Sequence, residues 1–300
     1  MNSWKLFAPL YIKGLAYDES AADRLDNFMK SLPNPVQSLL ELVVLKHLET
    51  AVHILDVLVM VDQLLVLDPQ KITSKHRNAM YLAAILHDLG KLNLLNEVLD
   101  YLPPEGSQLS IASPLSAILT EANKTALEAA GIEVEQVTGL DHLRSHELES
   151  VKIVENLRSK YAYLLNIIYN RRYEIELAQK LSGRHHAYNC TLRKWPTSKE
   201  GDSENLIFID PIEKHLLALF VIADVVAALL GNRRYRANSE VDSTEIVNYV
   251  EQQFKSNPEL KDLDFEKYRP FVASFFIKLV DGQSTTAQKL QAWVNSLKVV

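Results

Sequence analysis

A histidine and an aspartate stand side by side at His87 and Asp88, in the stretch AAILHDLGKL, and Lys91 follows three residues later. The preceding residues 83–86 are all apolar, so the pair belongs to a predicted helix with an apolar face. A carboxylate in such surroundings is costly unless a positive charge meets it. The stretch therefore raises the question of which groups elsewhere in the chain accompany Asp88.

Further imidazoles and carboxylates fall where the predicted helices would meet. Glu49 and His53 are four residues apart, which places them on one face of a helix. The other members are a histidine at a helix start, a histidine doublet and an aspartate within an apolar helix: His146, His185, His186 and Asp224. Nitrogen and oxygen donors that converge from several helices suit divalent Fe, Mn, Zn or Ni. A bound cation would also offset the buried charges of Asp88 and Asp224.

The order of these segments resembles that of a known family. HILDV from His53, ILHDLGK, HELES from His146, the HH doublet and IADVVAALLGNRRYR together resemble the HD superfamily of metal-dependent phosphohydrolases, and most closely its HD-GYP phosphodiesterase branch. The resemblance covers roughly His53 to Arg236 and implies an all-α HD-domain helical bundle with a metal site between its helices. The metal ligands implied by the resemblance are His53, His87, Asp88, His146, His185, His186 and Asp224.

The resemblance also implies roles for the residues around these ligands. Glu49 would be the carboxylate that marks members able to hold a third metal ion. Lys91 matches the lysine of the family's HDIGK, which lies close to phosphate, and Arg233 and Arg236 match basic residues that face substrate phosphate. We therefore expect two divalent metal ions, or three if Glu49 takes part.

The loop that names the HD-GYP branch is rewritten in this chain. Where the branch has HHE leading into DGxGYP, the sequence reads HHAYNCTLRKWP, so that Ala187 replaces the glutamate and only Pro196 survives of the GYP element. This change argues against cyclic di-GMP as the substrate. It does not argue against the hydrolysis of phosphoesters in general.

The expected reaction is the hydrolysis of a phosphodiester in a nucleotide or cyclic (di)nucleotide. Two metal ions about 3.5 to 4 Å apart can activate a shared hydroxide that attacks phosphorus in line. Asp88 would bridge the ions and Lys91 would neutralise charge on the phosphate, as Arg233 and Arg236 would. His53, His87 and Asp224 would complete one ion, and His146, His185 and His186 the other. The alternative is a catalytically weak or inactive signalling or scaffold protein that binds a nucleotide or a partner protein.

Several of these residues have a second interpretation. His142 shares a helix face with His146 and could replace it as a ligand, although Ser150, where the family has a small residue, favours His146. Glu49 could instead orient a ligand histidine through a hydrogen bond. The arginines within 233–236 could serve as a cationic helix C-terminus. Three further histidines are expected to lie away from the site: His47, His76 and His215.

The bulk properties of the chain limit its partners and its location. Its 300 residues carry 32 basic and 38 acidic side chains, a formal charge of -6, which gives no basic field for a nucleic acid or an anionic membrane. A single cysteine, Cys190, excludes a disulfide framework and favours a reducing compartment. The N-terminus lacks signal-peptide features, and the apolar stretch 216–230 is short for a membrane span and holds Asp224. We therefore expect a cytoplasmic protein with a small phosphorylated or nucleotide substrate.

Helices must position these groups, because strand signals are nearly absent. Besides a helix that Ser74 caps, we predict helices at about residues 21–32, 38–67, 117–130, 146–157, 163–181, 211–230, 243–254, 265–280 and 286–297. We expect an N-terminal extension at 1–35, an HD-like domain at 36–240 with an insertion at about 101–139, and C-terminal helices at 241–300 packed on the same domain. The amphipathic helices after Phe265 offer a surface for a homodimer.

Overall fold

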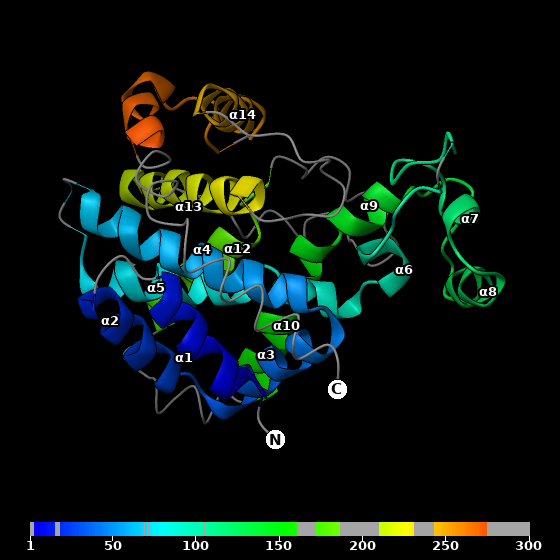
Figure 1. Ribbon diagram of the computed structural model, residues 1–300, viewed down its shortest axis with the longest axis horizontal. Coiled ribbons are helices and arrows are strands. Elements are labelled where there is room, and N and C mark those ends of the chain that lie inside the picture. Colours follow the sequence, from blue (N-terminus) through cyan, green and yellow to red (C-terminus); the bar gives the residue numbers. More distant parts are fainter. Residues whose placement is uncertain are drawn as a thin grey trace.

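The computed structural model describes residues 3–15, 19–68, 70, 72–104, 106–160, 172–186, 210–230, 243–257 and 259–274. Within these residues every regular element is helical, and one isolated antiparallel bridge joins Pro114 to Thr138. The all-α fold class expected from the sequence is therefore confirmed (Figure 1).

The described helices form a bundle that carries a smaller lobe at one end (Figure 1). In chain order they are α1 (Ser3–Leu15), α2 (Glu19–Lys30), α3 (Asn34–Lys46), α4 (Leu48–Leu67), α5 (Ser74–Leu86), η1 (Leu89–Asn93), α6 (Asn96–Leu99), α7 (Leu115–Ile118), α8 (Glu121–Ala129), α9 (Gly139–Arg144), α10 (His146–Lys160), α12 (Arg172–Ser182), α13 (Pro211–Leu230), α14 (Ser243–Ser256) and η5 (Phe265–Lys267). The two η elements are 3₁₀-helices.

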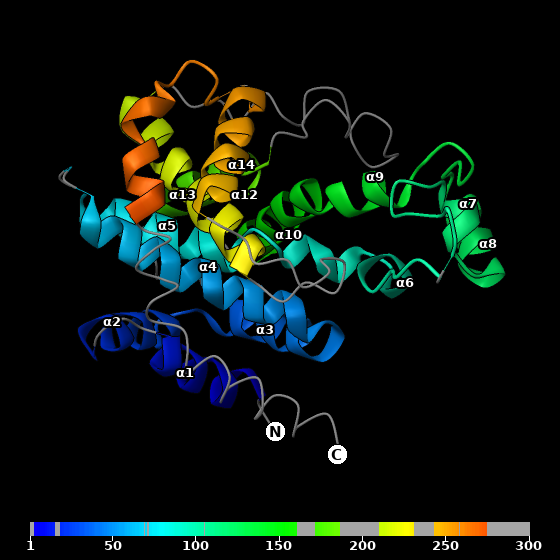
Figure 2. The same cartoon turned by 45° about the horizontal axis from the view of Figure 1, so that its top comes forward.

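The core of the bundle surrounds α4 and α13, which are apolar on almost every side. α1 and α2 cover one side of α4, while α13 packs on another side and lies beneath α14 (Figures 1 and 2). Ile54, Leu55 and Leu58 of α4 and Phe220 of α13 are completely buried. Each such side chain contributes about 1.5–3 kcal/mol on burial. These two helices thus form a rigid apolar framework that carries His53 and Asp224.

α4 is also the helix, among the described residues, that is long and apolar enough to cross a membrane by length and composition. However, 72% of its apolar window is buried inside the bundle. A core helix covered by other helices passes the same test, so its composition agrees with its position at the centre of the fold.

The long helix predicted over 38–67 is wrong in one respect, because the chain breaks at His47 into α3 and α4. His47 is extended, with φ -153° and ψ 93°, and its Nδ1 accepts a hydrogen bond from the Thr50 backbone N–H. This side chain caps an N–H at the start of α4 that has no partner within the helix. The break turns α4 into an independent helix whose second turn carries His53.

The N-terminal segment packs into the main core through two helices, of which the sequence predicted only the second. Trp4 and Ile12 of α1 and Leu25 of α2 belong to the same buried cluster as α4. Arg24 of α2 also binds the buried carboxylate of Asp62 on α4, with Nη2 2.8 Å from Oδ2. α1 and α2 therefore extend the bundle and stabilise α4 from the side opposite α13.

The segment predicted as an insertion forms a lobe with an apolar cluster of its own. Its buried members come from α6, α7 and the turns around them: Val98, Leu115, Leu119, Ile132, Val134 and Val137. The helix predicted over 117–130 is divided into α7 and α8 at Leu119 and Thr120. The lobe projects from the bundle beyond α6 and α9 (Figure 2). It joins the bundle through η1 and α10, both of which carry candidate site residues.

The C-terminal part of the described chain packs on the main core. Ile246 and Phe254 of α14, Phe265 of η5 and Val272 lie in the same buried cluster as α4 and α13. The predicted helix at 286–297 lies outside the described residues, as do 275–280 of the preceding one and 163–171 of the helix that contains α12.

Candidate metal centre

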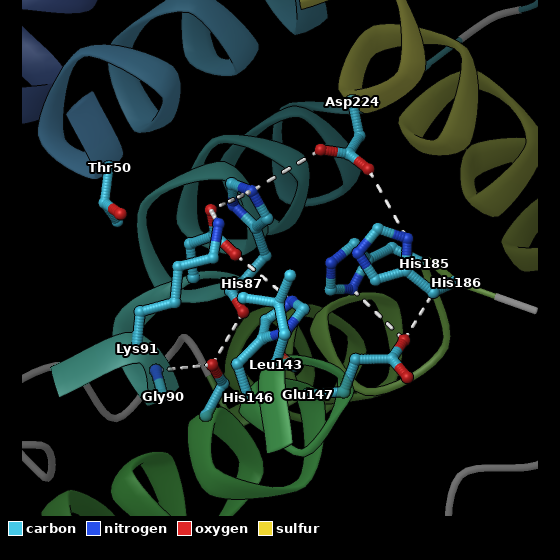
Figure 3. Close-up of polar contacts among 12 residues, drawn as sticks. Thr50, His87, Gly90, Lys91, Leu143, His146, Glu147, His185, His186 and Asp224 are labelled. Atoms are coloured by element: carbon cyan, nitrogen blue, oxygen red, sulfur yellow. Dashed lines mark hydrogen bonds and ion pairs between the residues drawn. The ribbon is translucent and has the colours of Figure 1, made fainter. Parts of the chain in front are cut away.

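Six elements bring the predicted metal ligands to one buried region (Figure 3). α4 supplies His53, and α13 supplies Asp224. His87 is the C-cap of α5, and Asp88 is the N-cap of η1. The remaining three are the first residue of α10 and the two residues that follow the α12 turn: His146, His185 and His186. All but the half-buried His186 are at most 7% exposed.

The donor atoms fall into two main groups. His53, His87 and Asp224 form one group, and the other contains His146, His185 and His186. Within each group the ligand atoms lie within 4.8 Å of one another, so these buried clusters could hold metal ions. A third such group, made of His87, Asp88 and His185, overlaps both of them.

The carboxylate of Asp88 lies between the two groups. Its Oδ2 is 3.6 Å from His87 Nε2 and 3.7 Å from His53 Nε2. Its Oδ1 is 3.2 Å from Nε2 of His146, in the other group. One oxygen of Asp88 therefore faces each group, as a bridging carboxylate requires.

Three of the imidazoles are oriented in the same way. The Nδ1 atoms of His87, His146 and His185 each lie 2.6 to 2.9 Å from the carbonyl oxygen three residues earlier in the chain. Because a carbonyl only accepts, each Nδ1 carries the proton and donates it, which leaves Nε2 with a free lone pair. All three Nε2 atoms are buried and have no hydrogen-bond partner. Buried nitrogens of this kind, fixed by a second-sphere carbonyl, fit the ligand set of a metal ion.

Burial keeps His146 and His185 in the neutral form that binds metals. It lowers the pKa of His146 to about 3, although Asp88 opposes the shift. It lowers the pKa of His185 to about 4, against the opposing effect of Asp224. Both side chains are thus neutral around pH 7, and no proton must leave them before a cation binds.

The two aspartates carry the negative charge of the centre. Burial alone would raise the pKa of Asp88, but the charge of Lys91 holds it well below its ordinary value. Burial opposes ionisation of Asp224 too, but a hydrogen bond from His53 holds its pKa well below the usual range. The Lys91 ammonium is 2.6 Å from Asp88 Oδ2. The centre therefore combines neutral nitrogen donors with ionised oxygen donors.

Backbone contacts fix the turn that carries Asp88. The Ser150 hydroxyl donates to the His87 carbonyl at 2.6 Å and accepts from the Gly90 N–H at 2.7 Å. A Cβ at Gly90 would lie 2.0 Å from the His146 carbonyl oxygen, so only glycine permits this approach to α10. Lys46 of α3 donates to the carbonyls of Leu92 in η1 and of Leu94 just after it, at 2.6 Å each. These contacts hold Asp88 against the start of α10.

Glu147 belongs to the centre although the sequence analysis did not single it out. Its carboxyl group is buried below His185 and His186 (Figure 3), and its Oε1 accepts the His186 backbone N–H at 2.9 Å. Burial raises its pKa well above the ordinary value, against the opposing effects of this hydrogen bond and Arg184. The sequence signals Glu147 only through its adjacency to His146, because its contact partner is distant in the chain.

Some predicted residues lie outside these groups. Glu49 is half-buried in the first turn of α4 and belongs to neither group, and its charge acts on His47. Lys91 lies at the centre through its ion pair with Asp88. The predicted phosphate-binding Arg233 and Arg236 lie outside the described residues, and so do Ala187 and Pro196 of the rewritten loop.

The remaining histidines have other partners. His142, the alternative to His146, has its Nε2 3.1 Å from the backbone nitrogen of Leu95, whose N–H it accepts, so it supports the lobe. His76 contacts the Tyr173 hydroxyl at 3.1 Å, and His215 lies 2.8 Å from Asp68. The prediction that His47, His76 and His215 are outside the site therefore agrees with their contacts.

Comparison of the chain with family models, curated proteins and solved structures gave no match.

Proposed function

We propose that this protein is a metal-dependent phosphohydrolase of the HD type that acts as a phosphodiesterase on a nucleotide or cyclic nucleotide. The strongest support is the pair of buried three-residue groups with Asp88 between them. The ordered motifs of the sequence, which resemble those of the HD superfamily, supply the same residues.

The donor set suits two divalent ions, of Fe, Mn, Zn or Ni. His53, His87 and Asp224 would hold one, the second histidine group would hold the other, and Asp88 would contact both. Ions bound there would supply an activated water at neutral pH and polarise a phosphoryl oxygen. Glu49 would be a ligand of a third ion. The geometry supports this role least, because Glu49 belongs to none of the donor groups.

Charge favours an anionic substrate. The ionised side chains of the centre, Asp88 and Asp224, carry two negative charges, fewer than the positive charges that two divalent ions bring. Lys91 adds a further positive charge, and its side chain is 14% exposed, so it can meet solvent. A phosphate group would neutralise this excess as charge develops on its oxygens. The net negative charge of the chain favours a small phosphoester over a polymeric nucleic acid.

Metal content and hydrolysis measured together test this proposal. Protein loaded with Mn²⁺ is freed of excess metal, assayed for bound metal by plasma mass spectrometry, and incubated with bis(p-nitrophenyl) phosphate. We expect about two bound ions and measurable hydrolysis. Asp88→Ala should lose both, while the matched control His76→Gln, on α5 but outside the centre, should keep both.

Three outcomes would contradict the proposal. A wild-type protein that takes up no metal would remove the basis of the chemistry, and equal metal content in Asp88→Ala would show that metal binds elsewhere. Uptake of two ions that Asp88→Ala abolishes, without hydrolysis of any phosphodiester tested, would instead favour the alternative of a signalling protein that binds nucleotides.

A further inference from the structure

Two histidine–aspartate pairs link α4 to α13. At the metal centre, His53 of α4 lies 2.9 Å from Asp224 of α13, measured from Nε2 to Oδ1. At the other end, His215 of α13 lies 2.8 Å from Asp68, the C-cap of α4, measured from Nε2 to Oδ2. The helix that supplies the histidine in one pair supplies the aspartate in the other. The two helices therefore run antiparallel and are joined by a polar pair near each end.

The distant pair has a third member. Nδ1 of His215 lies 2.8 Å from the Tyr268 hydroxyl, which follows η5. An ionised Asp68 only accepts, so His215 donates to it from Nε2 and accepts the Tyr268 O–H at Nδ1. The side chain of Asp68 is 2% exposed and that of His215 13% exposed. We refer to Asp68, His215 and Tyr268 as the distal clamp.

Apolar packing and polar pairs restrain α13 in different ways. Residues 216–223 between the clamp and Asp224 are all apolar and almost completely buried. Apolar packing is not directional, whereas a buried hydrogen bond requires one alignment of its donor and acceptor, and a shift that breaks it leaves both groups unsatisfied. His215 and Asp224 are about 13 Å apart along the helix axis, at 1.5 Å per residue. A displacement allowed at His215 would be transmitted to Asp224 through a rigid helix.

We propose that His215, with Asp68 and Tyr268, is a positioning residue for the metal centre: the distal clamp fixes the register of α13 against α4 and so holds Asp224 opposite His53. The predicted effect on metal binding rests on the proposed function. The predicted effect on the contact between His53 and Asp224 does not require a metal ion. His215 itself touches neither metal ligand of the pair, and it acts only through α13.

The test uses the full chain and four variants. His215→Phe keeps the ring but removes both hydrogen bonds, whereas His215→Gln retains a donor for Asp68. Tyr268→Phe removes only the outer hydrogen bond. His76→Phe is the matched control, because His76 makes a similar bond to the Tyr173 hydroxyl but links α5 to α12.

Two readouts separate positioning from simple loss of structure. In metal-free protein, the NMR signal of the His53 Nε2 proton reports the hydrogen bond to Asp224. In titrations with Co²⁺, the affinity and the visible d–d spectrum report the geometry of the donors. We expect His215→Phe to lose or shift the His53 signal and to weaken Co²⁺ binding by about 10- to 100-fold, the usual cost when a ligand such as Asp224 loses the contact that orients it. His215→Gln should recover most of both, and His76→Phe should resemble the wild type.

The outcomes distinguish this inference from the proposed function. If the wild type binds Co²⁺ and His215→Phe binds it with the same affinity and spectrum, the distal clamp does not position the centre. If the wild type binds no Co²⁺, the proposed function fails, and the His53 signal decides: an unchanged signal in His215→Phe overturns the clamp, and a lost signal supports it. If His215→Phe does not fold, Tyr268→Phe takes its place, and wild-type values for both readouts then overturn the inference.

Discussion

A single hydroxyl, that of Ser150, holds the backbone on both sides of Asp88. It connects α10 to the His87 carbonyl and the Gly90 N–H, both of which are buried. His146, a predicted ligand, lies one turn before Ser150 on α10. The contacts of Ser150 therefore set Asp88 at a fixed distance from the donor group that contains His146. The turn therefore depends on glycine at position 90 and on the hydroxyl of Ser150.

Ser150→Ala should lower both stability and metal affinity. The variant leaves a buried carbonyl and a buried N–H without their partner, which costs about 1–3 kcal/mol for each unsatisfied group. We expect urea unfolding of the metal-free protein to give a loss of about 2–6 kcal/mol. Ser159→Ala, which removes an exposed hydroxyl bonded to Asn156, serves as the control and should change little. A Ser150→Ala variant as stable as the control would show that water or the backbone replaces the hydroxyl.

Glu147 should act on the metal centre through hydrogen bonding and not through its charge. Glu147→Gln keeps an oxygen that can accept the His186 N–H, whereas Glu147→Ala removes it. We expect near wild-type Co²⁺ affinity in Glu147→Gln and a loss of about 10- to 100-fold in Glu147→Ala. Isothermal titration with both variants checks this order. A comparable loss in both variants would instead assign the effect to the carboxylate charge.

At the level of elements, the sequence predicts most helices of the bundle. It misses the features that depend on a side-chain cap or on contacts between distant segments. The periodic apolar residues of α4, α10 and α13 predict these helices because their packing faces are continuous. The break at His47 is missed because a side-chain cap, and not the apolar pattern, ends α3 there. Glu147 is missed for a similar reason: its partner His186 comes from another element, and no spacing in the sequence records that contact.

His142 on α9 is a titrating group that is not among the predicted metal ligands. Burial lowers the pKa of His142 to about 4, from an ordinary value near 6.5. Below pH 6.5 the unfolded chain takes up a proton that the folded chain does not, so stability falls as the pH drops towards 4. The slope is about 1.4 kcal/mol per pH unit for this one histidine.

His142→Gln should reduce this dependence while retaining an acceptor for the Leu95 N–H. Unfolding of the metal-free protein in urea at pH 7, 6 and 5 measures it. We expect the free energy of unfolding of the variant to fall less than that of the wild type, by up to about 1.4 kcal/mol for each pH unit. Parallel curves for the two proteins would mean that His142 titrates normally in the folded state.

At the scale of the whole molecule, the metal centre is built by the helices of the bundle and not by the lobe. Its donors come from α4, α10, α13, the start of η1 and the ends of α5 and α12, which lie in or against the main apolar cluster. The lobe has a separate cluster and contributes none of the described donors. Metal binding should therefore stabilise one part of the molecule more than the other.

Mn²⁺ added at about 100 times its dissociation constant should stabilise the fold by about 2.7 kcal/mol, because a ligand that binds only the folded state shifts the equilibrium towards it. We expect the midpoint of thermal unfolding to rise by several degrees and to fall back when a chelator is added. Hydrogen exchange should slow in α4, α10 and α13, whose opening would disperse the donors, but should change little in α7 and α8. Asp88→Ala should show none of these effects. Equal protection in the lobe and the bundle would instead mean that the two apolar clusters open as one cooperative unit.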